Sequence, residues 1–374
     1  MEKPWSLPSS LKTDCRSFRG DVPCQPHKTS GVHCIETDGT ACAHYQRTSS
    51  NILVIKLGAI GDVIRTTPIL HALKALHPEA RFWWLTLSPE VVPSLVDVIL
   101  PFTARSLATL EGQHFDVLIN LDKDLEACSL ATHLSARVKK GFVLSSGKPA
   151  PADNDAVHKF MTGVFDDLSR ENRKSYLQEI FEVCGLTFSG ERYILDAHRD
   201  AGYLWHLPKK KKIVGLNTGC GGRWITRLWP EKSWISLARR VKRAGYVPLF
   251  LGGEQEDAKN RKLARQSGGI YLGHFGLPQF INLVDQCELV VTAVTMAMHI
   301  TIGLGKKIVL FNNIFNKLEF ELYGLGEIIE PPSACTCFYA PRCTHPDFAP
   351  LGCMETIRVD TVFSACTKLL RSHA

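Results

Sequence analysis

The chain has 374 residues, enough for two domains that each bury a core, and its 45% hydrophobic and 22% charged residues are globular values. The net charge of +7 suits an acidic ligand or an anionic membrane surface and, without a nucleic-acid-binding motif beside it, predicts no nucleic-acid partner. Because the sequence has neither a long uncharged apolar run nor an apolar stretch near its start, we expect a cytoplasmic protein without transmembrane helix or secretory signal.

The first 48 residues form a cysteine-rich segment with little apolar periodicity. It holds Cys15, Cys24, Cys34 and Cys42, accompanied by histidines. A segment this short cannot bury a core, and the cytoplasm disfavours disulfides, so these cysteines predict a structural zinc ion or iron–sulfur cluster. Because no C-x-x-C pair occurs among them, a loosely ordered tail that carries thiols is the alternative.

The first β-strand, turn and helix are expected directly after this segment. Residues 52–55 form a short apolar run rich in β-branched side chains, which predicts a buried strand. Gly58 and Gly61 then allow a tight turn, and Pro68 favours a helix that begins beside it. This order places Asp62 at the carboxyl edge of a parallel sheet, where open α/β folds bind ligands. An ordinary surface carboxylate is the alternative.

Further strands and helices are expected to alternate up to about residue 205. The expected elements are a strand over 81–87, a short helix over 91–98, a strand over 115–121, a helix over 126–138 ended by residues 139–141, a loop over 145–160 and a helix over 173–185. Asp122 and Lys123 directly follow a predicted strand, which makes them candidates for the ligand edge, with a solvated turn as the alternative.

The same pattern restarts after a basic linker near residues 200–212. A strand over 213–216 leads into a glycine-rich loop over 217–230, which runs into a helix. Backbone N–H groups at a helix start and the guanidinium groups of Arg223 and Arg227 together suit a diphosphate. The alternative is a structural loop whose arginines pack on neighbouring tryptophans.

The last third of the chain continues this alternation. It is expected to contain a strand over 287–292, a helix from Thr295 to Leu304, a strand over 307–311 and a closing helix over 356–370. The N–H groups at the start of the helix at Thr295 suit a phosphate, whereas His299 on that helix would by itself more often be a buried structural histidine. Four cysteines between the last strand and the closing helix are compatible with a metal clip: Cys335, Cys337, Cys343 and Cys353.

Two strings in the chain, K-L-G-A-I-G-D-V-I-R-T-T-P and G-C-G-G-R-W-I-T-R-L-W-P-E-K-S-W, resemble motifs at the two ends of the cleft in glycosyltransferase family 9, the ADP-heptose:lipopolysaccharide heptosyltransferases. A third motif of that family, G-D-T-x-A-M-H, reads A-V-T-M-A-M-H here, so Val294 stands in place of the Asp that is associated with the donor nucleotide site. The cysteine-rich start also resembles a leader found on a subset of the family.

The resemblance implies an α/β protein of the GT-B fold, in which two Rossmann-like domains face a cleft. Its parts would be the cysteine-rich segment over 1–48, an acceptor domain over 50–205, a donor domain over 206–355 and a closing helix over 356–374, which in such enzymes often crosses back to the first domain. It further implies an inverting transfer that needs no cofactor, with ADP-heptose as donor and a lipopolysaccharide core or other surface glycan as acceptor, at the inner face of the cytoplasmic membrane.

The resemblance also implies roles for particular residues. Asp62 would be the general base. The donor side would comprise Thr218, Gly219, Arg223, Arg227, Thr295, Met296 and His299, and the acceptor side Gly58, Gly61, Asp122 and Lys123. Two other classes stay open: a sugar-nucleotide epimerase on the same fold, and a catalytically idle member that binds a ligand or senses a metal, which Val294 and the cysteines motivate. A dehydrogenase is disfavoured because G-x-G-x-x-G is absent.

Overall fold

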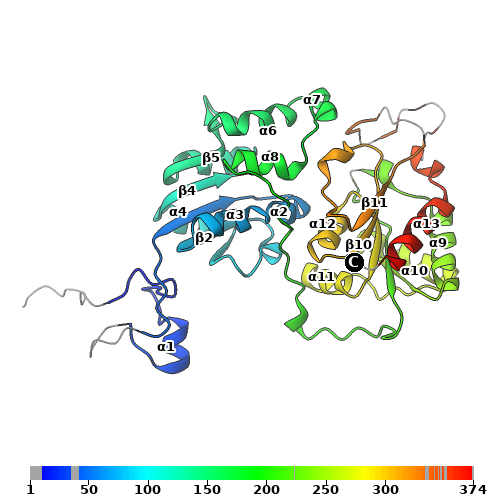
Figure 1. Cartoon of the computed structure of the whole chain (residues 1–374), viewed down its shortest axis with the longest axis horizontal. Coiled ribbons are helices and arrows are strands. Elements are labelled where there is room, and N and C mark those ends of the chain that lie inside the picture. Colours follow the sequence, from blue (N-terminus) through cyan, green and yellow to red (C-terminus); the bar gives the residue numbers. More distant parts are fainter. Residues whose placement is uncertain are drawn as a thin grey trace, which may run out of the picture.

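The computed structural model describes residues 11–34, 42–222, 224–332, 337–340, 342–343, 345, 348 and 352–372. Figure 1 shows two lobes side by side, each built on a β-sheet flanked by helices, with the cysteine-rich segment at the outer end of the first lobe. We call these lobes the N-terminal domain and the C-terminal domain. No helix in the described ranges is both long enough and apolar enough to cross a membrane.

The N-terminal domain is built on a six-stranded sheet with the order β3-β2-β1-β4-β5-β6. The strands are β1 (Ser50–Ile55), β2 (Ala80–Thr86), β3 (Val98–Pro101), β4 (His114–Asn120), β5 (Ser135–Ser145) and β6 (Lys148–Pro151). Only β5 and β6 pair antiparallel. The helices are α2 (Ile60–Thr66), α3 (Ile69–Leu76), α4 (Ala104–Glu111), α5 (Leu125–His133), α6 (Val157–Thr162), α7 (Asp166–Glu171) and α8 (Tyr176–Val183).

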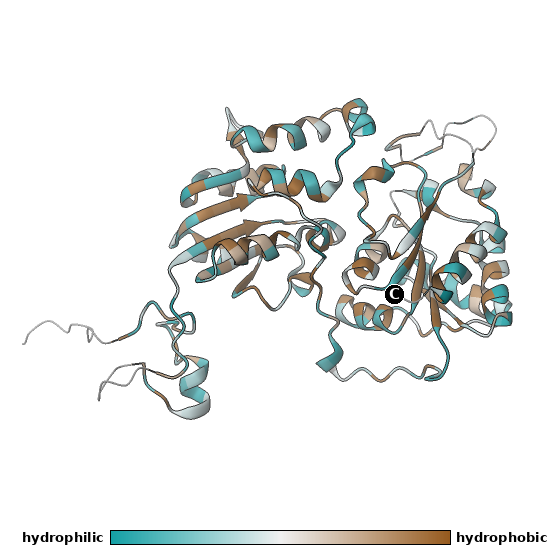
Figure 2. Cartoon of the chain, in the orientation of Figure 1, coloured by the Kyte–Doolittle hydropathy of each residue, from teal (hydrophilic) through white to brown (hydrophobic). Residues whose placement is uncertain are grey.

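The C-terminal domain has a five-stranded parallel sheet with the order β11-β10-β9-β7-β8. Its strands are β7 (Ile213–Asn217), β8 (Val247–Leu251), β9 (Leu289–Ala293), β10 (Lys307–Phe311) and β11 (Gly326–Ile329), and its helices are α9 (Glu231–Arg243), α10 (Asp257–Ser267), α11 (Leu277–Asp285), α12 (Met296–Gly303) and α13 (Val359–Arg371). Most strands of both sheets are hydrophobic along their length (Figure 2), as parallel strands covered by helices must be, whereas β5 carries Arg137, Lys139 and Lys140. The two sheets confirm the predicted α/β class.

Asp62 lies inside a helix, whereas the sequence predicted a turn before one. Helix α2 already begins at Ile60, which puts Asp62 in its first turn. Pro68 is the N-cap residue of α3, so a helix begins beside it as predicted, and the proline also separates α3 from α2, because it lacks the N–H that a continuous helix would need there. The backbone of α2 therefore fixes the direction in which Asp62 points.

Three other predictions for the N-terminal domain are wrong. Residues 91–98 form no helix beyond the short turn Pro89–Val91, and the expected loop over 145–160 contains β6 and part of α6. Residues 139–141 lie in β5 and do not end a helix. Gly141 has a positive φ of 87°, and a Cβ there would clash with the carbonyl of Asn120 on β4, so this glycine allows two strands to approach.

Helix α13 packs against its own domain and does not follow the expectation that it crosses back to the first. Its buried residues Val362, Cys366 and Leu370 join a cluster with Trp234 of α9 and Val309 of β10. The closing helix therefore completes the apolar cover of the C-terminal sheet.

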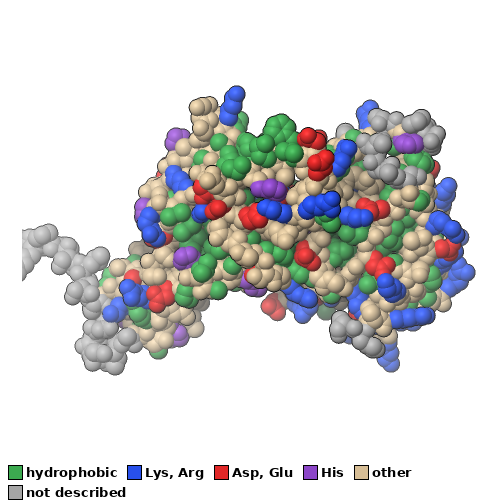
Figure 3. Space-filling model, turned by 45° about the horizontal axis from the view of Figure 1, so that its top comes forward, with side chains coloured by type: hydrophobic (Ala, Val, Ile, Leu, Met, Phe, Trp, Pro, Cys, Tyr) green, Lys and Arg blue, Asp and Glu red, His purple; other side chains and the backbone are tan. Residues whose placement is uncertain are grey.

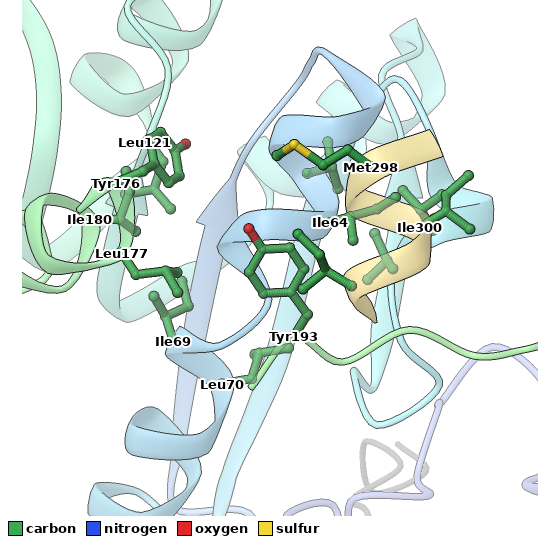
Figure 4. Close-up of a cluster of buried hydrophobic side chains, with 14 of the residues drawn as sticks. Ile64, Ile69, Leu70, Leu121, Tyr176, Leu177, Ile180, Tyr193, Met298 and Ile300 are labelled. Carbon is green, nitrogen blue, oxygen red and sulfur yellow. The ribbon is translucent and has the colours of Figure 1, made fainter. Parts of the chain in front are cut away.

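The two domains meet through α2 and α12, which share one hydrophobic cluster. Figure 4 shows Ile64 of α2 facing Met298 and Ile300 of α12, with Tyr193 of the connecting segment beside them. A Cβ at Gly61 would clash with the ring of His299, so glycine is needed for this close approach. The contact holds the carboxyl edges of the two sheets next to each other.

Candidate active site

A cavity of about 770 Å³ lies between the two domains. One wall is the loop after β1 with the start of α2, and the other wall is built from the loops after β7, β8, β9 and β10. Figure 3 shows acidic, basic and histidine side chains mixed with hydrophobic ones along the middle of one face of the molecule. The cavity thus occupies the strand-end position that open α/β sheets use for ligands.

Asp62 and Arg65 form the charged part of the N-terminal wall. Arg65 Nη2 lies 2.8 Å from Asp62 Oδ1, one helical turn away, and its guanidinium stacks on Tyr176 at 3.3 Å from the ring centroid. Our sequence analysis missed Arg65 as a site residue. The signal was its spacing from Asp62 in G-D-V-I-R, which puts both side chains on one helix face.

The charges around Asp62 keep it ionised. Burial raises the pKa of Asp62, but the positive charges of Arg65 and Lys56 outweigh burial, so the net pKa lies below the ordinary 3.8. Burial likewise opposes the charge of Arg65, yet Asp62 holds the pKa of that guanidinium above its usual range. A carboxylate that is ionised at neutral pH and faces a cavity is able to accept a proton.

Of the residues predicted for the acceptor side, only Gly61 lines this cavity. Asp122 is buried outside it, where it pairs with Lys56 and accepts a hydrogen bond from the backbone N–H of Leu57. Lys56 also donates to the carbonyl of Gly58. Asp122 and Gly58 therefore belong to a buried network that holds the loop before Asp62.

Lys123 lies near Phe142, with its Nζ 6.0 Å from the ring centroid, and does not line the cavity either. Burial lowers its pKa, and the nearby Lys159 adds to this effect. The structure therefore brings Lys123 close to the apolar side of β5 and not to Asp62.

Arg227 is the main cation of the C-terminal wall. It is buried, donates from Nη1 to the carbonyl of Val294 and donates from Nη2 to the carbonyl of Cys220 at 2.8 Å. Among the described residues it has no carboxylate partner, and its Nε has no hydrogen-bond partner. Burial lowers its pKa to about 10, so it still carries its charge at neutral pH. Such a guanidinium can hold an anion.

The predicted donor loop divides between the cavity and the protein interior. Gly219 lines the cavity, and a Cβ there would clash with Glu256. Thr218 points inward, where its hydroxyl donates to Asn260 Oδ1 at 2.6 Å. Asn217, which sequence reasoning missed, lines the cavity and donates to Thr292 Oγ1 at 2.9 Å. The predicted site residue Arg223 lies outside the described residues.

The start of α12 supplies three more predicted residues to the cavity wall: Thr295, Met296 and His299. Thr295 is the N-cap residue, so the first N–H groups of α12 are directed toward the cavity end of the helix. His299 stacks on Tyr193, and its Nδ1 has no partner among the described residues. Burial lowers the pKa of His299 to about 3, with Arg65 contributing, so this histidine is neutral at neutral pH.

Aromatic residues and the carboxylates of Glu256 and Glu319 complete the C-terminal wall. Trp224 and Phe315 pack edge to face at 6.1 Å, and both lie near the guanidinium of Arg227. Glu319 accepts a hydrogen bond from the hydroxyl of Tyr339 at 2.7 Å, and both residues line the cavity. This mixture of flat apolar surfaces and a few polar groups is typical of sites for small organic ligands.

The two groups of cysteines lie away from this cavity. Cys15, Cys24, Cys34 and Cys42 line a small cavity of their own, and Cys337, Cys343 and Cys353 line another. Cys335 lies outside the described residues. In the described part of the chain, no three His, Cys, Asp or Glu side chains stand in an arrangement that could already hold a metal ion.

Comparison with solved structures identifies the fold. A glycosyltransferase family 9 protein from Veillonella parvula DSM 2008 matches with a TM-score of 0.63 and 18% identity, over 86% of this chain and 97% of that one. E. coli ADP-heptose lps heptosyltransferase II matches with a TM-score of 0.62 and 15% identity, over 86% and 98%. The iron-containing dodecameric glycosyltransferase TibC of enterotoxigenic E. coli H10407 gives 0.54 and 12%, over 90% and 84%.

These likenesses show that the protein has the two-domain GT-B fold, as predicted. The family model of glycosyltransferase family 9 (heptosyltransferase) matches residues 104–314, which is more than half of the chain. The protein therefore belongs to glycosyltransferase family 9 and is a glycosyltransferase. The matched range contains the donor loop and α12 but not Asp62. A comparison with curated proteins returns no match.

Proposed function

We propose that the protein is an inverting glycosyltransferase that moves heptose from ADP-heptose to a hydroxyl of a lipopolysaccharide core or another surface glycan. One observation carries the proposal: a single cavity has an ionised carboxylate, Asp62, in one wall and a guanidinium without a carboxylate partner among the described residues, Arg227, in the other. The first suits a base for an acceptor hydroxyl, and the second suits the diphosphate of a donor.

In this proposal the C-terminal wall holds the donor. Arg227 and the first N–H groups of α12 at Thr295 bind the diphosphate, and Gly219, which leaves room for Glu256, forms part of the same wall. Trp224 and Phe315 offer flat surfaces to the base or the sugar. Two solved E. coli WaaC heptosyltransferase complexes, with ADP and with ADP-2-deoxy-2-fluoro heptose, support ADP-heptose as the donor.

The reaction then follows from the positions of the two charges. Asp62 takes the proton of the acceptor hydroxyl while its oxygen bonds to the anomeric carbon. The bond from that carbon to the diphosphate breaks on the opposite face, so the configuration inverts, and ADP leaves with the electron pair. Arg227 and the helix N–H groups offset the charge that develops on the leaving group. No cofactor takes part, and the metal site predicted at the N-terminal cysteines is separate because those cysteines do not line the cavity.

The site also supports a proposal about location. The acceptor would be presented at the inner face of the cytoplasmic membrane, and a peripheral contact there would use the basic outer surface of α9 and α10. Exposed basic side chains on these helices include Lys232, Arg239, Lys242, Arg243, Arg261, Lys262 and Arg265. No nucleic-acid partner is part of the proposal.

Val294 favours a second candidate, an idle member of the family that binds a ligand without transferring sugar. Valine lines the cavity where related sequences have Asp, and its side chain cannot accept a hydrogen bond from the donor. A family member that modifies the nucleotide sugar without an acceptor, such as an epimerase, is distinguished by the same assay.

Thermal unfolding with ADP, UDP, GDP and their sugar conjugates tests the donor first, because a ligand stabilises the native state by RT ln(1 + [L]/Kd). We expect the largest rise in Tm with ADP or ADP-heptose, and glycoside formation only when an acceptor is present. No shift with any nucleotide would reject the donor site. A shift without transfer to any acceptor would favour the idle protein, and conversion of the donor alone would favour the epimerase.

A further inference from the structure

The cysteine-rich segment is folded without a hydrophobic core. None of its described residues, 11–34 and 42–48, is buried, and helix α1 (Gln25–Ser30) buries no side chain. Even so, its two ends pair through a backbone bridge between Cys15 and Arg47, and the backbone N–H of Lys12 donates to the carbonyl of Cys34. A chain this short cannot be held by apolar burial and needs a disulfide, a metal or a partner.

All four cysteines of the segment line one small cavity, which Phe18, Val32 and His44 also line. Cys15, Cys24, Cys34 and Cys42 come from separate parts of the segment and line the same small cavity, and all four are free thiols. The cavity has a volume of about 20 Å³, which is room for a single atom. Four thiols around one small space are the ligand set that tetrahedral zinc favours, although they do not yet stand in coordinating positions.

We propose that these four cysteines bind one zinc ion as thiolates. Zinc favours four sulfur ligands in a closed tetrahedral site, at about 2.3 Å from each sulfur. An iron–sulfur cluster contains several iron and sulfide atoms and is too large for this cavity. Because the thiols do not already stand in coordinating positions, zinc draws them together as it enters, and binding is coupled to the tightening of the segment.

The ion would also fix how the segment sits on the N-terminal domain, because Arg16 follows the ligand Cys15. Arg16 Nη1 reaches both carboxylate oxygens of Asp97, at 2.6 and 2.7 Å, and Nη2 donates to the carbonyl of Ala80 at 2.9 Å. These contacts are at the β2–β3 side of the sheet. Figure 1 shows the segment at the end of that domain away from the C-terminal domain, so the zinc acts on structure and not on transfer.

Metal analysis of the full chain tests this proposal. Wild type, the double variant Cys24→Ser/Cys34→Ser and the control Cys184→Ser are purified in reducing buffer and analysed for zinc, iron and acid-labile sulfide. We expect the double variant to contain one zinc ion fewer per chain than wild type and the control, whose cysteine is buried at the end of α8. The difference between variants cancels any metal held elsewhere, including at Cys337, Cys343 and Cys353.

Limited proteolysis is the second measurement. A zinc chelator should speed cleavage within residues 11–48 of wild type, while the main thermal transition of the double variant stays unchanged, because the segment shares no core with either domain. Equal zinc in wild type and double variant would overturn the proposal. Iron with sulfide in place of zinc, or disulfides among the four cysteines in the reducing preparation, would overturn it as well.

Discussion

The two walls of the interdomain cavity are built alike but carry charge differently. Each wall begins with the loop that follows an interior buried strand, β1 in one domain and β7 in the other. Beside the N-terminal wall, the cations Lys56 and Arg65 are each paired with a carboxylate. In the C-terminal wall Arg227 donates to backbone carbonyls and forms no ion pair with a described carboxylate, although Glu256 and Glu319 line the same cavity.

This difference separates the tasks of two similar loops. A wall whose charges cancel does not attract an anion, yet it can hold an ionised carboxylate in place beside a neutral hydroxyl. A guanidinium without a carboxylate partner, next to the start of a helix, can bind a diphosphate. Similar βα-loops can therefore form a base site or an anion site, according to whether the nearby arginine has an acidic partner.

Removal of the carboxylate should cause the largest loss. We expect Asp62→Asn to lower the transfer rate by about 10²–10⁴-fold, the usual contribution of a general base, while ADP still raises the Tm. Steady-state transfer assays and thermal shifts measure the two properties. The exposed Asp155→Asn in the same domain is the matched control. Transfer at the wild-type rate in Asp62→Asn would remove the base from the proposed mechanism.

Removal of the unpaired guanidinium should mainly affect donor binding. We expect Arg227→Met to weaken ADP binding by about 2 kcal/mol, which is roughly 30-fold, because a hydrogen bond to a charged group is lost. Adenosine, which lacks the phosphates, should bind wild type and variant alike in calorimetry. An equal loss for adenosine and ADP would mean that Arg227 supports the shape of the wall and does not bind the diphosphate.

The fold could be predicted well where a sequence pattern is typical of one kind of structure only. Continuous apolar runs located β1, β4, β7, β9 and β10, because strands covered by helices on both faces must be apolar throughout. A prediction failed where the same residue type is typical of two different structures. Gly141 was interpreted as the end of a helix, although it lies in β5 and relieves a clash with a neighbouring strand.

The site could be predicted less completely because its contacts join distant residues. The clash that makes Gly61 necessary involves His299, and the carbonyl that holds Arg227 belongs to Val294. No local periodicity reports such pairs, so motif resemblance alone pointed to most of them. Arg65 was missed because its partner Asp62 explains it only once both are known to share a helix.

His299 lies with a neutral ring where the two walls meet at Gly61. Its burial should make the free energy of unfolding depend on pH. Its pKa is about 3 in the folded protein and 6.5 when exposed, so the unfolded state binds an additional proton between these values. Stability should therefore fall as the pH is lowered, by about 2 kcal/mol between pH 7 and 5 from this group. Urea unfolding at several pH values should show a flatter profile for His299→Gln than for the control His133→Gln, and parallel profiles would contradict this assignment.

Removal of Arg65 should have the smallest effect on transfer, because it leaves the carboxylate of Asp62 without its ion-pair partner but does not remove the base. Arg65 lowers the pKa of Asp62, so Arg65→Gln should raise that pKa. Asp62 loses its basic form as the pH falls through its pKa, and the acidic limb of kcat/KM against pH should therefore move to higher pH, with little change at neutral pH. The control Lys74→Gln alters a cation on α3 outside the cavity. An acidic limb that stays in place in Arg65→Gln would show that a group other than Asp62 controls it.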